Sequence, residues 1–480
     1  MEIYSTQISL LLVVVVGFLG YSLARELYIQ SINRRKAAKL GCHDAPRLQA
    51  WDPIFGIDIL ITGMAALRLH NLLKFYDSKF QQCGNTVDVK VLNLPRISTA
   101  DPENIKMVLA KGFEDFGLGP RRAHFLGPLV GHGIFTTEGA PWKRSRQLLR
   151  PNLTKHQDLN LPMFESHIHH LLALVPKDGQ TVDLQELFCR LTIDSGTELL
   201  FGTSCGSLLE DENIDANLSF SKALDTAQSE MIIRDILGPF LSRFRSEKRF
   251  RDSLKSVHDF IDLYVQKAMT YVKSLEEVDP SEKRYIFLEE LAKYSTDPLV
   301  LRWESINVLI AGRDTTAVLL GNTWWVLARR PDIWAKLKSE VEVLEGKPPT
   351  YEQLKELKYV RWLLSESLRL YPVLPINART ANKDTTLPTG GGPDGKSPIF
   401  VPKGSEVAWN TWTMHRRKDL YGDDAEEFIP ERWEHLRPTW EYLPFNGGPR
   451  ICLGRKSLGF FRAQYFAAIN SLTHTQNNTH

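Results

Sequence analysis

Apolar residues recur at intervals of three and four along several long stretches of the chain. Such spacing places side chains on one face of an α-helix, because the helix completes a turn every 3.6 residues. The pattern predicts helices over Leu254–Leu275, Leu299–Arg330 and Tyr351–Tyr371. Strand patterns are scarcer, over Val87–Leu94 and over Ile399–Val407, which contains a Pro and a Gly. The sequence therefore predicts a mainly α body with a minor β-sheet region.

The amino-terminal stretch Ile3–Ala24 contains no charged side chain over 22 residues. As a helix it would be about 33 Å long, enough to cross a hydrocarbon core of about 30 Å. Basic residues are concentrated just after it, and only Glu2 precedes it. By the positive-inside rule we expect a single membrane-spanning anchor with the rest of the chain in the cytosol. A cleaved secretory signal is the alternative, but the basic segment that should precede it is missing.

The remaining chain is predicted to have a simple organisation. Residues 1–24 form the anchor, 25–50 a basic linker, and 51–480 one large globular domain. Within that domain, the Gly- and Pro-rich stretch Leu387–Pro398 is predicted as a surface loop, since apolar patterning resumes on both sides.

Composition narrows the function. With 43% hydrophobic and 24% charged residues the chain is an ordinary globular protein, and a net charge of +2 argues against nucleic acid as its main partner. The five cysteines are odd in number and contain no C-x-x-C pair, so neither a disulfide framework nor a zinc ribbon is expected. One cysteine could still act alone as a thiolate ligand or nucleophile.

The segment Phe445–Gly454 reads F-N-G-G-P-R-I-C-L-G and presents one such cysteine, Cys452. Glycines allow the backbone to approach a flat group closely, and successive N–H groups can donate to a thiolate. Arg450 can pair with a carboxylate. Haem combines a metal that accepts a soft ligand with carboxylates. A buried structural cysteine in a turn is the alternative for a cysteine seen alone, but here the whole spacing F-x-x-G-x-R-x-C-x-G is present.

With this motif the sequence resembles the haem-thiolate monooxygenases of the cytochrome P-450 superfamily, over residues 50 to 465. The resemblance implies that haem b (iron protoporphyrin IX) is the cofactor and that Cys452 is the axial ligand of its iron. It also implies that Phe445, Arg450 and Gly454 contribute to cofactor binding.

A second motif, Ala311–Thr316 (A-G-R-D-T-T), lies inside the predicted helix Leu299–Arg330. It resembles the family's central helix, in which an acid and an alcohol lie over the haem. Asp314 and Thr315 are therefore expected to be catalytic and to steer protons. Gly312 would leave room for dioxygen. The alternative is a helix kink with a Thr bonded to the preceding turn.

Further matches concern arginines. Trp142 and Arg146 fit W-x-x-x-R, whose two side chains reach a haem propionate in the family, and Arg121 and Arg379 resemble two more propionate-binding positions. Glu366-x-x-Arg369 matches the family's E-x-x-R pair, joined by Arg432, to which we assign a folding role.

Two departures from the family pattern follow Cys452. Leu458 and Phe461 stand where Ala and Glu are usual, and Leu458 adds volume where a helix packs on the haem. Only 28 residues follow Cys452, so the small terminal sheet with its substrate-contacting turn is expected to be missing. An incomplete reading of the gene, an unusual splice form and a short enzyme remain open.

The resemblance implies an endoplasmic-reticulum enzyme that uses dioxygen and electrons from an NADPH-cytochrome reductase to hydroxylate a lipophilic substrate. The subfamily cues resemble the fungal branch acting on n-alkanes and fatty acids; a secondary-metabolite intermediate is the competing substrate. These cues are Gly41-Cys42, Phe116–Arg122, Gly131–Phe135 and Ala311–Ala317. A haem-thiolate isomerase or dehydratase and a truncated, non-catalytic haem protein are the alternatives from other classes.

Overall fold

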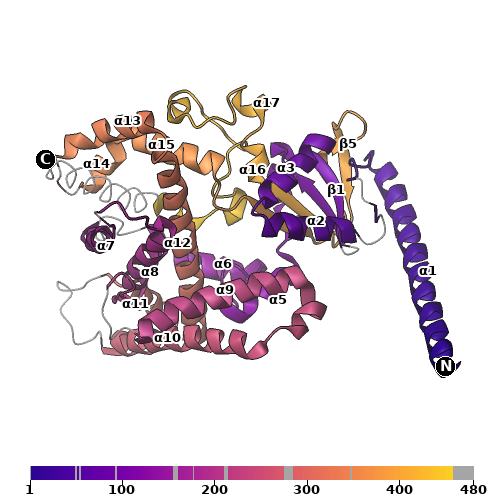
Figure 1. Cartoon of the computed structure of the whole chain (residues 1–480), viewed down its shortest axis with the longest axis horizontal. Helices are drawn as coiled ribbons and strands as arrows, with labels where there is room; N and C mark the ends of the chain where they lie inside the picture. Colours follow the sequence, from indigo (N-terminus) through magenta and orange to yellow (C-terminus); the bar gives the residue numbers. More distant parts are fainter. Residues whose placement is uncertain are drawn as a thin grey trace. The chain divides into compact units, whose positions relative to one another are not determined.

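The computed structural model describes residues 2–48, 51–52, 56–91, 94–154, 161–176, 178–209, 215–274, 285–345, 347 and 349–457. These residues are mainly helical with a minor sheet component, as the sequence predicts (Figure 1). The chain divides into two compact units. The sheet unit comprises residues 1–119, 375–425 and 439–450, and the helical unit comprises residues 120–374, 426–438 and 451–480.

The sheet unit contains a five-stranded sheet and a separate two-stranded hairpin. The sheet has the order β1-β2-β7-β4-β3, in which β2 and β7 are parallel and the other neighbours are antiparallel. The strands are β1 (Thr86–Val91), β2 (Leu94–Thr99), β3 (Phe116–Gly117), β4 (Ile376–Ala381), β7 (Glu406–Asn410) and, in the hairpin, β5 (Thr385–Gly391) and β6 (Ser397–Val401). The helices are α1 (Glu2–Lys39), α2 (Ile57–Arg68), α3 (Leu72–Cys83), α4 (Pro102–Lys106), α16 (Thr411–Met414) and α17 (Lys418–Tyr421), with short turns η1 (Met107–Lys111), η2 (Phe113–Asp115) and η8 (Gly448–Arg450).

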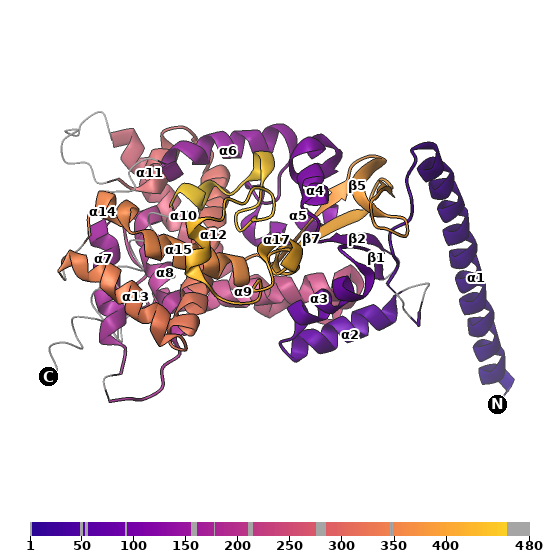
Figure 2. The same ribbon diagram turned by 90° about the horizontal axis from the view of Figure 1, so that it is seen from above.

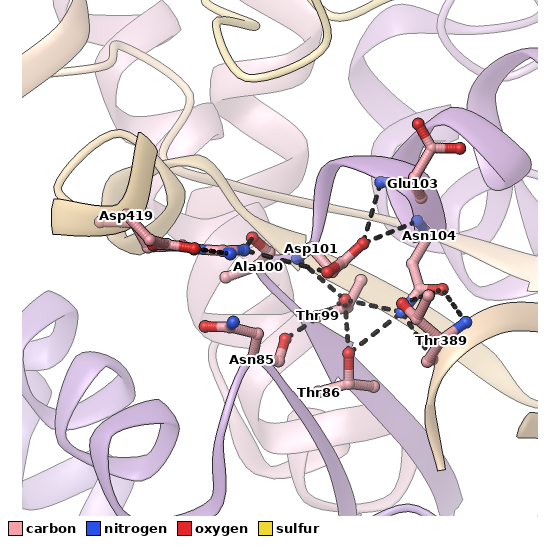
Figure 3. A network of polar contacts seen from close by, with 10 residues as sticks. Asn85, Thr86, Thr99, Ala100, Asp101, Glu103, Asn104, Thr389 and Asp419 are labelled. Carbon is pink, nitrogen blue, oxygen red and sulfur yellow. Dashed lines mark hydrogen bonds and ion pairs between the residues drawn. The ribbon is translucent and has the colours of Figure 1, made fainter. Parts of the chain in front are cut away.

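A buried amide joins the two sheets of this unit (Figure 3). Asn104 of α4 is fully buried, and its Nδ2 donates to Thr86 Oγ1 at 3.0 Å and to the Thr389 carbonyl at 3.0 Å. Its Oδ1 accepts from the Thr389 N–H at 3.1 Å. Because a buried amide left without partners costs free energy, these bonds fix β1 and β5 around α4.

The helical unit packs around α12 (Pro298–Leu327), with α8 (Leu184–Phe201) lying alongside it (Figure 1, Figure 2). Asp297 caps the first turn of α12 by accepting from the Leu299 N–H, and Pro298 occupies its first position. The other helices are α5 (Gly119–Val130), α6 (Gly139–Thr154), α7 (Leu161–Ala173), α9 (Asp215–Leu241), α10 (Glu247–Ser274), α11 (Phe287–Ala292), α13 (Pro331–Val341), α14 (Tyr351–Glu356) and α15 (Lys358–Leu370), with short turns η3 (Ser242–Phe244), η6 (Glu342–Leu344), η7 (Pro430–Glu434) and η9 (Leu453–Ser457).

The helices predicted from apolar spacing are confirmed as α10, α12 and the pair α14 and α15, which are separated at Leu357. The predicted surface loop Leu387–Pro398 is wrong. Most of it is the β5–β6 hairpin, in which Leu387 and Ile399 are buried. The glycines that suggested a loop form its turn: Gly392 has φ 77° and Gly395 has φ 67°, values that glycine adopts without strain.

The amino-terminal stretch is helical, and α1 continues through the first part of the predicted linker to Lys39. Over the described part of the chain, no helix has both the length and the apolarity needed to cross a membrane. The predicted membrane span over residues 3–24 is not confirmed.

Inside the helical unit, the predicted pair Glu366 and Arg369 is completely buried. The Glu366 carboxylate accepts from Arg369 Nε at 2.8 Å and Nη2 at 2.7 Å, and from Arg432 Nε at 3.4 Å. It also accepts from the Ile429 N–H and from Trp433 Nε1, each at 3.0 Å. The carboxylate therefore joins α15 to the η7 segment.

We expect Glu366→Ala to lower the free energy of unfolding by roughly 3–5 kcal/mol, because the Arg369 guanidinium would remain buried without its counter-charge. Denaturant unfolding measures the loss. Glu352→Ala is the matched control: it removes the exposed partner of Lys355, 2.9 Å away on α14, and should change stability little. Similar small losses in both variants would contradict the folding role of Glu366.

Candidate functional site

Cys452 lies just before η9, with its side chain accessible to solvent but surrounded by protein on most sides. Desolvation raises the pKa of its thiol, while the backbone N–H groups of Gly454 and Arg455 and the guanidiniums of Arg146 and Arg455 act in the opposite direction. Two N–H donors and two cations around a sulfur favour a thiolate, and coordination to a metal would remove the remaining cost of ionisation. This donor set suits a sulfur that serves as a metal ligand.

The α6 helix supplies the neighbours of this cysteine. Arg146 donates from Nη1 to the Ile451 carbonyl at 3.1 Å, and its guanidinium lies 5.9 Å from the ring centroid of the buried Trp142. Desolvation lowers the pKa of Arg146, so an anionic partner would stabilise its charge. The structure therefore brings three predicted site residues, Trp142, Arg146 and Cys452, to one place.

The α12 helix presents an opening at its centre. Gly312 is exposed although Arg313 and Thr316 beside it are buried, and a Cβ atom added at Gly312 would meet no heavy atom within 4 Å. The Cys452 side and this helix share one core, because Leu453 packs against the hydrophobic cluster that includes Leu309 of α12. An accessible thiol and an open glycine on a central helix fit a large flat cofactor.

Thr315 follows this glycine by one turn. Its Oγ1 donates to the Ala311 carbonyl at 2.5 Å, the bond to the preceding turn that the sequence left open as an alternative. Because the hydroxyl gives its single proton to this carbonyl, its oxygen remains available as an acceptor. Thr316 makes the equivalent bond to Gly312.

Asp314 is held from α9, a contact that sequence reasoning missed. Gln228 Nε2 donates to Asp314 Oδ2 at 2.5 Å, and Arg313 Nη1 donates to Asp314 Oδ1 at 3.0 Å. Arg313 is only 4% exposed and also binds Asp225 of α9 at 2.7 Å. No sequence signal marks Gln228 or Asp225, which lie 86 and 88 positions before their partners.

Three predicted residues belong to the sheet unit: Arg379 lies in its segment 375–425, and Phe445 and Arg450 lie in its segment 439–450. Arg379 of β4 is buried, donates to the Ala378 carbonyl at 2.8 Å and lies over the Trp409 ring. Phe445 and Arg450 are half-buried.

The tight course of the Phe445–Gly454 segment depends on a glycine. Gly448 has φ 67°, and a Cβ atom added there would lie 1.8 Å from the Leu109 carbonyl oxygen of η1. Only glycine fits this close approach of two backbones.

Arg121 does not lie with the Cys452 group in its described contacts. Its guanidinium binds the Asp235 carboxylate of α9 at 2.8 and 3.1 Å and is half exposed. The next residue, Arg122, was not predicted; burial lowers its pKa, and it donates to the Phe135 carbonyl at 3.1 Å. Leu458 and Phe461, the two departures from the family pattern, lie outside the described residues.

Comparison with known proteins decides the family. The model of the family "Cytochrome P450" matches residues 46–457. The chain belongs to the cytochrome P450 family. It is 42% identical to Cytochrome P450 monooxygenase himC of Aspergillus japonicus, over 94% of this chain and 82% of that protein. It is 43% identical to Cytochrome P450 52A12 of Debaryomyces hansenii, over 91% of this chain and 86% of that protein.

Cytochromes P450 are haem-dependent monooxygenases, so the predicted enzyme class, fold family and cofactor are confirmed. The resemblance to fungal members is confirmed as well. Membership also implies dioxygen, a lipophilic substrate and a redox partner. For this P450, the roles of the individual site residues stay predictions.

A buried carboxyl group lies beside this site and was also missed. Glu304 of α12 is 2% exposed, and burial raises its pKa to about 7 although the Ser145 side chain and the Ile134 N–H bind it. Among the described residues, its Oε2 has no hydrogen-bond partner. Ser145 immediately precedes Arg146, so the charge of Glu304 bears on the packing of α6 against α12.

This carboxyl group predicts a pH dependence of stability. Its pKa is raised in the folded state, so its contribution to stability is complete below the unfolded pKa of about 4.5 and is lost as pH rises through about 7. Between pH 4.5 and pH 8, Glu304→Gln should therefore gain about 3 kcal/mol relative to the natural protein. Unfolding free energies at the two pH values test this, and a difference that does not change with pH would contradict it.

Proposed function

We propose that this P450 is a haem-thiolate monooxygenase that inserts one atom of dioxygen into a lipophilic substrate and reduces the other to water. The observation that carries the proposal is the environment of Cys452: an accessible sulfur that faces the Gly454 and Arg455 N–H groups and lies near the Arg146 guanidinium. Haem bound there would supply the redox-active iron at which dioxygen is activated.

Each site residue has a part in this proposal. Cys452 would hold the haem iron through its sulfur, and Phe445 and Gly454 would contribute to binding the cofactor. The Trp142 indole N–H would donate to the carboxylates of the haem. Arginines would bind these carboxylates by charge and N–H donation; they are Arg146, Arg450, Arg379 and Arg121. For Arg146, propionate binding is supported by its partly desolvated charge and by its hydrogen bond to the Ile451 carbonyl, next to Cys452.

The α12 residues are proposed to make room for dioxygen and to transfer protons. Gly312 leaves room for dioxygen, and the open space beside it supports this role. The Asp314 carboxylate takes up a proton from solvent and releases it toward the site. The Thr315 oxygen accepts a hydrogen bond from a water molecule beside it. The free acceptor capacity of the Thr315 hydroxyl supports this.

Electrons come from an NADPH-cytochrome reductase, and the enzyme is a single-pass protein of the endoplasmic-reticulum membrane with its catalytic domain in the cytosol. Residues 1–24 are the anchor, 25–50 the linker and 51–480 the catalytic domain. Exposed valines on α1 support the anchor: Val13, Val14 and Val16 are 61–69% exposed. A body tethered to a membrane favours substrates that partition into lipid.

Long-chain fatty acids or alkanes are the proposed substrates, and a secondary-metabolite intermediate is the competing one. The subfamily motifs around Phe116–Arg122 and Ala311–Ala317 support the first, as does the 43% identity to Cytochrome P450 52A12 over 91% of this chain. Metabolite profiling of a strain that lacks this protein decides between them.

We expect Cys452→Ala to abolish both the red-shifted Soret band of the reduced, carbon-monoxide-bound protein and NADPH-dependent product formation in microsomes, because no sulfur would remain to bind the iron. Cys83→Ala is the matched control, a half-buried cysteine of α3 without ligand context, and should leave both unchanged. Turnover by the Cys452 variant equal to that of the natural enzyme would refute the assignment.

Thr315→Ala should lower the amount of product formed per NADPH several-fold and raise peroxide release, because protons would no longer be directed to the reacting oxygen. Thr316→Ala is the control, since Thr316 makes the same bond one residue further along α12 but is buried. If both variants keep the natural ratio of product to NADPH, Thr315 has no part in proton delivery.

A further inference from the structure

We propose that Gln228 of α9 is a positioning residue for the catalytic acid, acting with Arg313 and Asp225 to fix the orientation of the Asp314 carboxylate. The inference rests on the proposed function, in which Asp314 handles protons. It assigns to α9 a role in coupling oxygen use to product formation.

The geometry is a closed ring of three side chains. The Gln228 amide uses both of its ends: Nε2 donates to Asp314 Oδ2 at 2.5 Å, and Oε1 accepts from Arg313 Nη1 at 3.3 Å. Arg313 closes the ring by donating to Asp314 Oδ1 at 3.0 Å. Each oxygen of the Asp314 carboxylate is therefore bound, one from α9 and one from its own helix, and the carboxylate plane is fixed.

The ring is held in place by a buried charge. Arg313 is 4% exposed, and a guanidinium removed from water needs counter-charges. Asp225 of α9, 2.7 Å from Arg313 Nη2, supplies one, and Asp314 supplies the other. Because one counter-charge is on α9, the position of Arg313, and with it that of Asp314, depends on where α9 lies.

Gln228 differs from the other members of the ring in what it can contribute. It is a neutral amide and adds nothing to the balance of charge, which is set by the Arg313 guanidinium and the Asp225 and Asp314 carboxylates. Its directional bonds decide instead which way the Asp314 oxygens point. The Asp314 side chain remains 36% exposed, so a fixed carboxylate still has a free edge from which to exchange a proton.

The test is a double-mutant cycle on the full-length, haem-loaded protein with its reductase. Gln228→Leu should lower product formed per NADPH and raise peroxide release by about the same factor as Asp314→Asn. The double variant Gln228→Leu/Asp314→Asn should be no worse than Asp314→Asn alone, because residues that act through one another are not additive.

Glu230→Gln is the matched control. Glu230 also anchors α9, through Arg245 of the segment after it at 2.7 Å, but does not take part in the ring around Asp314. This variant removes a contact of α9 but leaves the bonds of Gln228 and Asp225 to α12 in place, so the ratio of product to NADPH should not change. A loss of coupling equal to that of Gln228→Leu would reduce Gln228 to a general anchor of α9 and overturn the proposal.

A second measurement needs no turnover. The shifts in thermal unfolding temperature of the two single variants should sum to more than the shift of the double variant, since both alter the same contact between Gln228 and Asp314. Additive shifts would overturn the proposal whatever the turnover data. A natural enzyme without the thiolate spectrum would instead defeat the proposed function, whereas uncoupling by Asp314→Asn with natural coupling in Gln228→Leu would defeat this inference alone.

Discussion

The helical unit depends on one constraint: a charge removed from water must be met by donors or by an opposite charge. Cys452, Glu366 and Arg313 meet it in different ways. Glu366 is met completely, by two arginines, an indole N–H and a backbone N–H, and joins α15 to η7. Arg313 is met by carboxylates on two helices. Around Cys452, the N–H groups of Gly454 and Arg455 and the guanidiniums of Arg146 and Arg455 offset part of the cost of ionising the buried thiol, and a metal ion bound to the sulfur would offset the rest.

The same constraint separates two arginines that the sequence alone could not rank by environment. Arg146 is partly desolvated and donates to a neutral carbonyl, so an anion bound to its guanidinium would stabilise its charge. Arg121 already binds a carboxylate through two nitrogens, and a propionate would have to replace Asp235. Both arginines are predicted from sequence to bind a propionate, but the free energy available for binding a carboxylate differs between them.

Local pattern accounts for what could be predicted from the sequence. The helices α10, α12 and α15 could be predicted from the spacing of apolar residues. The tight course of the Phe445–Gly454 segment could be predicted from its glycines, because a side chain at a position such as Gly448 would clash with neighbouring backbone. The β5–β6 hairpin could not be predicted, because its glycines resemble those of a loop and its strands are fixed by distant partners such as Asn104. The contact of Gln228 with Asp314 was equally out of reach, since the fold alone brings the two residues together.

These contacts divide α12 into parts with different freedom. Near its carboxyl end, the buried Thr323 bonds to Ser367 of α15 at 2.9 Å, one residue from Glu366, so this part shares the rigid Glu366 network. Near its amino end, Glu304 and Asn307 bind the segment between α5 and α6, through the Ile134 and Phe135 N–H groups. The centre has Gly312 facing open space and an acid held by side chains of α9. Both ends are fixed by buried polar groups, whereas the contacts that α9 makes with the centre come from Gln228, which is half-buried, and Asp225, which is exposed. A displacement of α9 would therefore change the orientation of Asp314 before it changed the course of α12.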